Sequence, residues 1–251
     1  MKKRILITGD DGYKSIGVRL LAKILVPEYE VTIVATKEQR SGVGGGTKAY
    51  GTKTWGKDKV ENVDAYWVDG NPADAMEFAQ GLFPNKFDCV VSGINWGENI
   101  GLSTITASGT GGAAIRSLAV NLAPHAVIMS LLLGTQDTTW TNDTSQQSIE
   151  SFISYPGDSA AFILQQAFEN DFWKRPFVNV NFPVLPTKEY RLTTLVPDLS
   201  LYYKYPVHFN GNQYSYDEQV YAFQGKPDCD ISVDVGALWN GYISVTPFQI
   251  G

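Results

Sequence analysis

Cysteine and histidine are scarce in this chain, whose 251 residues include only two of each. Two cysteines are too few for a disulfide framework in a protein of this size, so Cys89 and Cys229 are expected to be thiols. Neither belongs to a cysteine pair of the metal-binding kind, and His125 and His208 lie far apart in the sequence. A zinc site built from cysteine and histidine is therefore poorly supported.

The chain also lacks an excess of positive charge and a long apolar run. A formal net charge of −6 argues against a surface for nucleic-acid polymers, which is usually basic. The longest apolar stretch, residues 126–133, is too short to span a bilayer, and the one behind the basic N-terminus is too short for a signal peptide. With 43% hydrophobic and 18% charged residues, we expect a globular cytoplasmic protein without membrane contact.

Strand-like and helix-like patterns alternate through most of the chain. Strands are expected at residues 4–8, 29–35, 65–68, 87–93, 126–132 and 177–182, and helices at residues 16–25, 73–82, 113–121 and 159–170. This alternation predicts an α/β fold, a Rossmann-like, mostly parallel sheet with helices on both faces.

The pattern changes at about residue 184. Aromatic and β-branched segments follow at residues 190–196, 202–205, 213–222 and 242–246, with Pro, Gly and Asn between them. Such segments are typical of β-hairpins. We therefore expect residues 1–183 to form the core and residues 184–251 to form a β-rich extension that serves as an oligomerisation segment.

Two adjacent carboxylates, Asp10 and Asp11, follow the first expected strand. Ligands of open α/β sheets bind outside the carboxyl ends of the strands, so this pair is expected at a site. Each charge disfavours the ionised form of its neighbour, and a cation held between them would remove that conflict. The alternative is an ordinary polar turn, since Asp and Gly are common in turns.

Other loops at the same edge of the sheet bring further oxygen and amide groups. They contribute Ser41 from the glycine-rich residues 40–47, Asn95 and Asn99 from residues 94–101, and Ser108, Gly109 and Thr110 at a helix start. Carboxylate, hydroxyl and amide oxygens suit Mg²⁺, Mn²⁺ or Ca²⁺, and N–H groups at a helix start bind anions. Together they suit phosphoryl-group hydrolysis. The alternatives are helix caps for Ser108 and Thr110, turn formers for Asn95 and Asn99, and a generic α/β ligand-binding domain.

A series of motifs then points to one family. The motifs are TGDDG at residues 8–12, RSG at 40–42, GNPAD at 70–74, SGINWGENIG at 92–101, SGT at 108–110, NVNFP at 179–183 and GYISVTP at 241–247. In this order and at this spacing the chain resembles the SurE family, the survival-protein 5′/3′-nucleotidases, over nearly its whole length.

The resemblance implies a phosphatase that acts on nucleoside monophosphates and depends on a divalent cation, Mg²⁺ or Mn²⁺. It also implies a C-terminal segment exchanged between subunits, and so a homodimer or homotetramer. The metal ligands would be Asp10, Asp11, Ser41 and Asn95; Ser108, Gly109 and Thr110 would hold the phosphate, and we assign Asn99 to the same subsite. The two aspartates would be the catalytic residues, one of them, with Asp10 favoured, orienting or deprotonating the attacking water.

The chain departs from the family at Gly9, Gly45, Gly46, Ser103, Ala107 and Arg116. These departures leave open a catalytically weakened member that binds nucleotide or metal without efficient turnover. A dinucleotide-binding oxidoreductase is disfavoured, because Asp10 and Asp11 place two negative charges where a pyrophosphate would lie. A phosphatase of the haloacid-dehalogenase type usually spaces its two aspartates by one residue, whereas adjacent aspartates favour direct attack by water.

Overall fold

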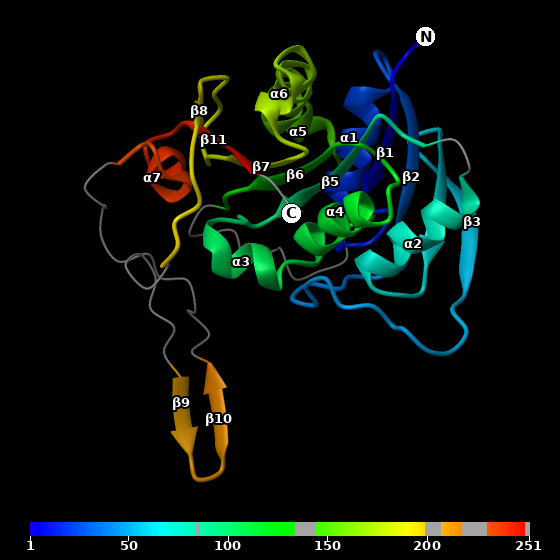
Figure 1. The fold of residues 1–251 in the computed structure, drawn as a ribbon, viewed down its shortest axis with the longest axis horizontal. Helices are drawn as coiled ribbons and strands as arrows, with labels where there is room; N and C mark the ends of the chain where they lie inside the picture. The colour runs from blue at the N-terminus through cyan, green and yellow to red at the C-terminus, as the bar shows by residue number, and fades with distance from the viewer. Residues whose placement is uncertain (84–85, 134–143, 199–206, 217–229, 249–251) are drawn as a thin grey trace.

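A nine-stranded sheet forms the centre of the computed structural model, which describes residues 1–83, 86–133, 144–198, 207–216 and 230–248 (Figure 1). The strand order is β3-β4-β2-β1-β5-β6-β7-β11-β8. The strands are β1 (Arg4–Thr8), β2 (Glu30–Thr36), β3 (Trp55–Val60), β4 (Val63–Val68), β5 (Cys89–Trp96), β6 (Ala126–Leu131), β7 (Phe177–Phe182), β8 (Tyr190–Leu192) and β11 (Ile243–Phe248). Neighbouring strands are parallel except in the pairs β3–β4 and β7–β11, which confirms the mostly parallel α/β sheet.

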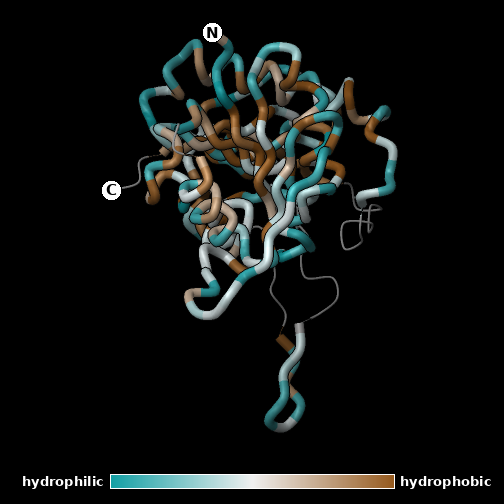
Figure 2. Tube along the Cα trace, turned by 90° about the vertical axis from the view of Figure 1, so that its right-hand side faces the viewer, coloured by the Kyte–Doolittle hydropathy of each residue, from teal (hydrophilic) through white to brown (hydrophobic). Residues whose placement is uncertain are grey.

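Helices cover both faces of this sheet. They are α1 (Ile16–Leu25), α2 (Pro72–Leu82), α3 (Gly101–Ala107), α4 (Gly109–Ala119), α5 (Glu150–Phe152), α6 (Asp158–Glu169) and α7 (Asp234–Trp239), with short irregular turns η2 (Ile153–Gly157) and η3 (Asp171–Lys174). In β1, Ile5 and Ile7 contribute to the core under α1 and α6, whereas Leu6 contributes to the core under α2 and α4. Because strand side chains alternate between faces, each central strand serves both cores, and Figure 2 shows these strands as the hydrophobic centre.

The C-terminal part differs from the expected extension. β11 pairs with β7, and β8 pairs with β11, so β8 and β11 both belong to the central sheet. The core therefore does not end at residue 183. Residues 234–239, not expected as a helix, form α7, whose Val235 and Leu238 pack against Ile100 and Val196. The cause is burial: Ile243 and Val245 of β11 join the main core, and Val235 and Leu238 of α7 form a smaller cluster beside it, which a local pattern does not reveal.

One separate hairpin does form in this region. β9 (Val207–Asn210) and β10 (Gln213–Tyr216) pair as an antiparallel two-stranded sheet that stands away from the central sheet (Figure 1). The strand expected at residues 202–205 and the end of the one at 213–222 lie outside the described residues. Within the described residues, none of the helices combines the length and apolar character needed to cross a bilayer.

Candidate active site

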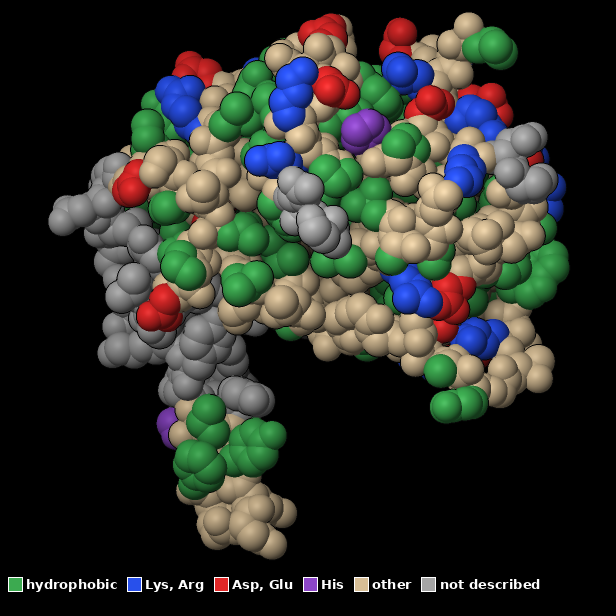
Figure 3. Space-filling view, in the orientation of Figure 1, with side chains coloured by type: hydrophobic (Ala, Val, Ile, Leu, Met, Phe, Trp, Pro, Cys, Tyr) green, Lys and Arg blue, Asp and Glu red, His purple; other side chains and the backbone are tan. Residues whose placement is uncertain are grey.

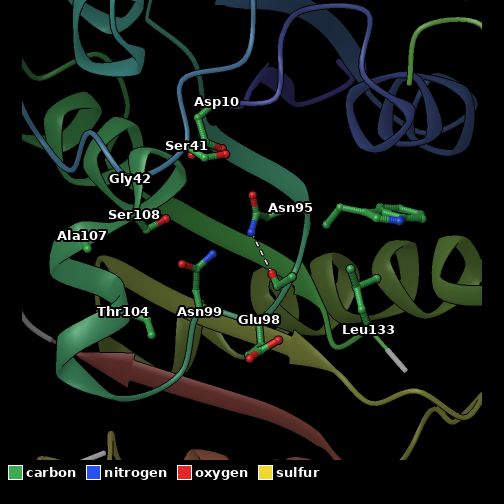
Figure 4. A pocket seen from close by; sticks show the side chains of 12 residues that line it. Asp10, Ser41, Gly42, Asn95, Glu98, Asn99, Thr104, Ala107, Ser108 and Leu133 are labelled. Atoms are coloured by element: carbon green, nitrogen blue, oxygen red, sulfur yellow. Dashed lines mark hydrogen bonds between the residues drawn. The ribbon is translucent and has the colours of Figure 1, made fainter. Parts of the chain in front are cut away.

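A pocket of about 420 Å³ lies where β1 and β5 end (Figure 4). Its lining residues are Asp10, Ser41, Gly42, Asn95, Trp96, Gly97, Glu98, Asn99, Thr104, Ala107, Ser108 and Leu133. Five of the eight residues assigned to the site from sequence are among them: Asp10, Ser41, Asn95, Asn99 and Ser108. Three are not, namely Asp11, Gly109 and Thr110, so the predicted set is brought together only in part.

Asp10 follows β1 and is buried at one end of the pocket, only 3% exposed. Its Oδ1 accepts a hydrogen bond of 2.5 Å from the Thr110 hydroxyl. Burial raises the pKa of Asp10, and the hydrogen bonds from Thr110 and from the backbone of Gly109 offset this only partly. The pocket therefore holds a carboxylate whose charge is poorly solvated.

Helix α4 begins directly against this carboxylate. A Cβ atom at Gly109 would lie 2.7 Å from Asp10 Oδ2 and 2.8 Å from Asp10 Cβ, so only glycine allows the approach. Thr110 is fully buried, and its hydroxyl lies within hydrogen-bond distance of Asp10 Oδ1 and, at 3.2 Å, of Asn95 Oδ1. One hydroxyl proton can be donated to only one of these oxygens at a time. In this structure Gly109 and Thr110 thus contact Asp10 but do not themselves line the pocket.

Asp11 lies beside Asp10 without lining the pocket. Burial raises its pKa to about 7, with a further contribution from the negative charge of Asp10, while hydrogen bonds from the Trp96 backbone and the Gln39 side chain act in the opposite sense. The conflict between the two acids that the sequence suggests is therefore present in the structure. A cation beside them would favour the ionised form of both.

Asn95 reaches the pocket because β5 is irregular. The strand extends to Trp96 rather than ending at residue 93, and its pairing with β6 shifts register between Ser92 and Asn95. Such bulges re-aim side chains and are frequent beside active sites. The Asn95 Nδ2 donates to the Gly97 carbonyl at 2.7 Å, so this residue also shapes the turn after the strand.

The glycine-rich loop brings Ser41 and Gly42 to the same pocket. Ser41 is exposed, and its Oγ accepts a hydrogen bond from the Gln39 side chain at 3.3 Å. The Gly44 N–H donates to the Ala107 carbonyl at 2.9 Å, and a Cβ at Gly112 would lie 2.3 Å from the Gly44 carbonyl oxygen. Here the close approach that glycine permits is to the backbone of α3 and α4.

Ser108 combines the two roles that the sequence leaves open. Its Oγ accepts a hydrogen bond from the Gly111 N–H at 3.0 Å, which confirms that it caps α4. It also lines the pocket, opposite the end formed by Glu98 and Leu133 (Figure 4). Residues 96–98, 104 and 133 also line the pocket and were not assigned to the site from sequence. A sequence signal existed for residues 96–98, which lie inside the same motif, 92–101, as Asn95 and Asn99.

The donor set fits a hard divalent cation better than a zinc ion. The described lining residues include the carboxylates of Asp10 and Glu98 and no lysine, arginine or histidine. No group of three or more His, Cys, Asp or Glu side chains suited to a metal occurs in the part of the chain that the structure describes. A cation in this pocket would meet the carboxylates of Asp10 and Glu98 and complete its shell with hydroxyl and amide oxygens of the lining, as Mg²⁺ and Mn²⁺ accept.

Comparison with known proteins identifies the family of this chain. The model of the family described as "Survival protein SurE" matches residues 5–204. The chain belongs to the SurE family. A protein of Methanoculleus marisnigri named 5′-nucleotidase SurE is 31% identical, over 100% of this chain and 92% of its own length. One of the same name from Campylobacter fetus subsp. fetus is 30% identical, over 99% and 94%. The crystal structure of the SurE protein from Aquifex aeolicus has the same fold, with a TM-score of 0.74, 24% identity and coverage of 98% and 92%.

The positions noted as departures from the SurE pattern lie mostly away from the pocket. Among Gly9, Gly45, Gly46, Ser103, Ala107 and Arg116, only Ala107 is a lining residue. A Cβ at Gly9 would contact Val18 of α1 at 3.4 Å, and Arg116 of α4 forms an ion pair with Glu77 of α2. Of these departures in this SurE chain, only Ala107 therefore changes the lining of the pocket itself.

Proposed function

We propose that this protein hydrolyses nucleoside monophosphates and depends on a divalent cation. It is an enzyme, a phosphatase of the 5′-nucleotidase type, as the names of its SurE relatives indicate. The observation that carries the proposal is the buried carboxylate of Asp10, which lines a pocket of hydroxyl and amide groups and lies next to Asp11. Burial raises the pKa of both acids. A pocket of about 420 Å³ is of a size that receives small ligands.

Asp10, Asp11, Ser41 and Asn95 are the residues that would hold Mg²⁺ or Mn²⁺. The ion, when bound, would supply the positive charge that polarises a phosphate oxygen and makes water a better nucleophile at neutral pH. Asp10 orients the attacking water or accepts its proton, because its carboxylate lines the pocket while that of Asp11 does not. Thr110, through its hydrogen bond, holds the Asp10 carboxylate in one orientation.

Asn99 and Ser108 are the groups proposed to contact the phosphate, since both line the pocket near Asp10. Hydrogen-bond donors aimed at the equatorial oxygens would stabilise the charge that builds up there, typically by a few kcal/mol per donor. The N–H groups of Gly109 and Thr110 are directed at Asp10. They can serve the phosphate as well only if that carboxylate turns away from them.

Release of inorganic phosphate from a panel of 5′ and 3′ nucleoside monophosphates, with Mn²⁺ and with a chelator, tests this proposal. We expect turnover with Mn²⁺ and none with the chelator, and a higher melting temperature with Mn²⁺ because the ion binds the folded state. A melting temperature that rises without any phosphate release would indicate the weakened, binding member of the family. Phosphate release that survives the chelator would contradict the metal dependence.

The hairpin β9–β10 is proposed to join subunits into a homodimer or homotetramer. Phe209 and Tyr214 face each other across its strands and are 79% and 63% exposed. Figure 3 shows hydrophobic side chains gathered on this protruding element. Large exposed apolar groups on an isolated hairpin are typical of protein interfaces.

Serine at both positions (Phe209→Ser with Tyr214→Ser) should therefore shift the sedimentation coefficient towards that of a monomer. Leu185→Ser is the matched control, because Leu185 is 73% exposed but lies outside the hairpin, and it should leave the assembly unchanged. A monomeric wild type, or a double variant that assembles as the wild type does, would refute the role of the hairpin.

A further inference from the structure

A row of buried polar side chains crosses three neighbouring strands beneath the pocket. Ser130 of β6 is paired with Asn181 of β7, and Asn181 is paired with Ser244 of β11. All three residues are 0% exposed. Polar groups buried inside a sheet destabilise it unless they are hydrogen-bonded, so each member of the row needs a partner.

The partner of the first two members is Asn99, in the connection between β5 and α3. The Asn181 Oδ1 accepts from the Asn99 N–H at 2.8 Å, and the Asn181 Nδ2 donates to the Asn99 carbonyl at 3.1 Å. Ser130 Oγ lies 2.8 Å from the Asn99 Nδ2, and Asn179 Nδ2 donates to the same Asn99 carbonyl at 2.7 Å. Side chains of β6 and β7 thus hold both the backbone and the side chain of Asn99 by hydrogen bonds.

These hydrogen bonds to Asn99 take the place of the backbone hydrogen bonds of regular secondary structure. Asn99 lies outside β5 and α3, so its backbone N–H and carbonyl find no partners in a strand or helix. The side chain of Asn181 supplies one donor and one acceptor to that single residue, as a neighbouring strand would. Because Gly97 and Gly101 flank this segment with positive φ angles, the polypeptide by itself constrains the position of Asn99 weakly.

Neither Ser130 nor Asn181 lines the pocket, whereas Asn99 does. We propose that Asn181 and Ser130 are positioning residues of the enzyme, which set the place and orientation of Asn99 for binding the substrate phosphate. The inference rests on the proposed function for its substrate, but its geometry is independent of the metal ligands. Misplacing a substrate-binding group by about 1 Å can cost on the order of a hundredfold in rate.

The test compares Asn181→Ala and Ser130→Ala with Ser244→Ala. Ser244→Ala is the control, because Ser244 belongs to the same row but has no hydrogen bond to Asn99. Its replacement also removes a buried hydrogen bond, the one to Thr193 at 2.9 Å. We expect kcat/KM for a nucleoside monophosphate to fall at least about tenfold in Asn181→Ala, about fivefold in Ser130→Ala, and less than about twofold in Ser244→Ala. The affinity for Mn²⁺, measured by calorimetry, should stay within about twofold in all three, whereas a general loosening of the site would lower it.

A double-mutant cycle with Asn99→Ala shows whether the effect passes through Asn99. In the Asn99→Ala background, Asn181→Ala should have little further effect on kcat/KM. An undiminished effect there, or equal losses in Asn181→Ala and Ser244→Ala, would overturn the inference. Ser130→Ala removes a single atom, so it provides the comparison if Asn181→Ala fails to fold.

Binding of inorganic phosphate in the presence of Mn²⁺ separates this inference from the proposed function. If the wild type binds phosphate without turning over any nucleotide, the proposed function fails, and a weaker phosphate affinity in Asn181→Ala but not in Ser244→Ala still supports the positioning role. Equal affinities in those two variants refute it. A wild type that neither binds inorganic phosphate nor releases it from a nucleotide refutes both the proposed function and the positioning role.

Discussion

Asn in place of Asp10 (Asp10→Asn) is expected to lower phosphate release from nucleoside monophosphates by roughly a thousandfold or more. The amide keeps the shape of the carboxylate and an oxygen for the Thr110 hydroxyl. It removes the charge that would hold the cation and the base that would accept a proton from water. The measurement is kcat/KM at saturating Mn²⁺.

Thermal stability distinguishes a catalytic loss in Asp10→Asn from unfolding of the variant. Burial raises the pKa of Asp10 above its usual range, so the folded state holds its proton more tightly than the unfolded state does. Ionisation of Asp10 therefore destabilises the fold as the pH rises from about 4 towards its raised pKa. Without divalent cations, the variant should melt higher than the wild type at about pH 8 and no higher at about pH 4.

Asp64→Asn is the matched control for Asp10→Asn. The side chain of Asp64 is 47% exposed and forms an ion pair with Lys59 at 3.1 Å, and Asp64 does not line the pocket. Exposed pairs contribute about 1 kcal/mol or less, so both activity and melting temperature should change little. An Asp10→Asn enzyme with wild-type turnover would remove Asp10 from the mechanism.

Alanine at Gly109 is expected to be the second most damaging change. The added methyl group would lie 2.7 Å from Asp10 Oδ2 and 3.1 Å from the Arg40 carbonyl oxygen, so the start of α4 and the carboxylate have to move apart. Overpacking of this kind costs about 1–3 kcal/mol in stability. Because the displaced group is the proposed base, we expect kcat/KM to fall about a hundredfold or more.

Gly81→Ala provides the control, since it makes the same chemical change in another helix. Gly81 lies in the last turn of α2, and no atom lies within 4 Å of the position of its added Cβ. Alanine there should stabilise the helix by about 0.5–1 kcal/mol without an effect on turnover. Equal activity in Gly109→Ala and Gly81→Ala would show that the contact between α4 and Asp10 has no part in catalysis.

Most core elements were predictable because their signals are local. The short apolar run in β1 and the helical spacing in α1 each identify an element without reference to the rest of the chain. β3 was missed, since its sequence WGKDKV is polar and it forms an edge strand with a mixed burial pattern. β8, β11 and α7 were assigned to an extension, because their place in the structure depends on distant contacts: β11 pairs with β7, β8 pairs with β11, and α7 packs against Ile100.

The sequence predicted only part of the candidate site: Asp10 lines the pocket as expected, whereas Asp11 does not, and the second carboxylate of the lining, Glu98, was not expected. The turn after β1 places Asp10 at the sheet edge, and the SGINWGENIG motif brings Asn95 and Asn99 there. The assignment of Thr110 to the phosphate, by contrast, overlooked its hydrogen bond to Asp10, a residue 100 positions earlier in the chain. Asn181 stood out in the sequence as part of the NVNFP motif and as a polar residue in an otherwise apolar strand, and neither sign connects it to Asn99.

The sequence by itself determined that two acids follow a buried first strand and that a serine precedes the start of a helix. Both features depend on neighbours within a few residues, through a local apolar run and helix capping. Only the tertiary structure decided that α4 begins against Asp10. It also decided that Asn99 is held by Asn181, which lies 82 residues after it in the sequence. Such contacts follow from strand order and register, which are set by burial across the whole sheet and not by any single segment.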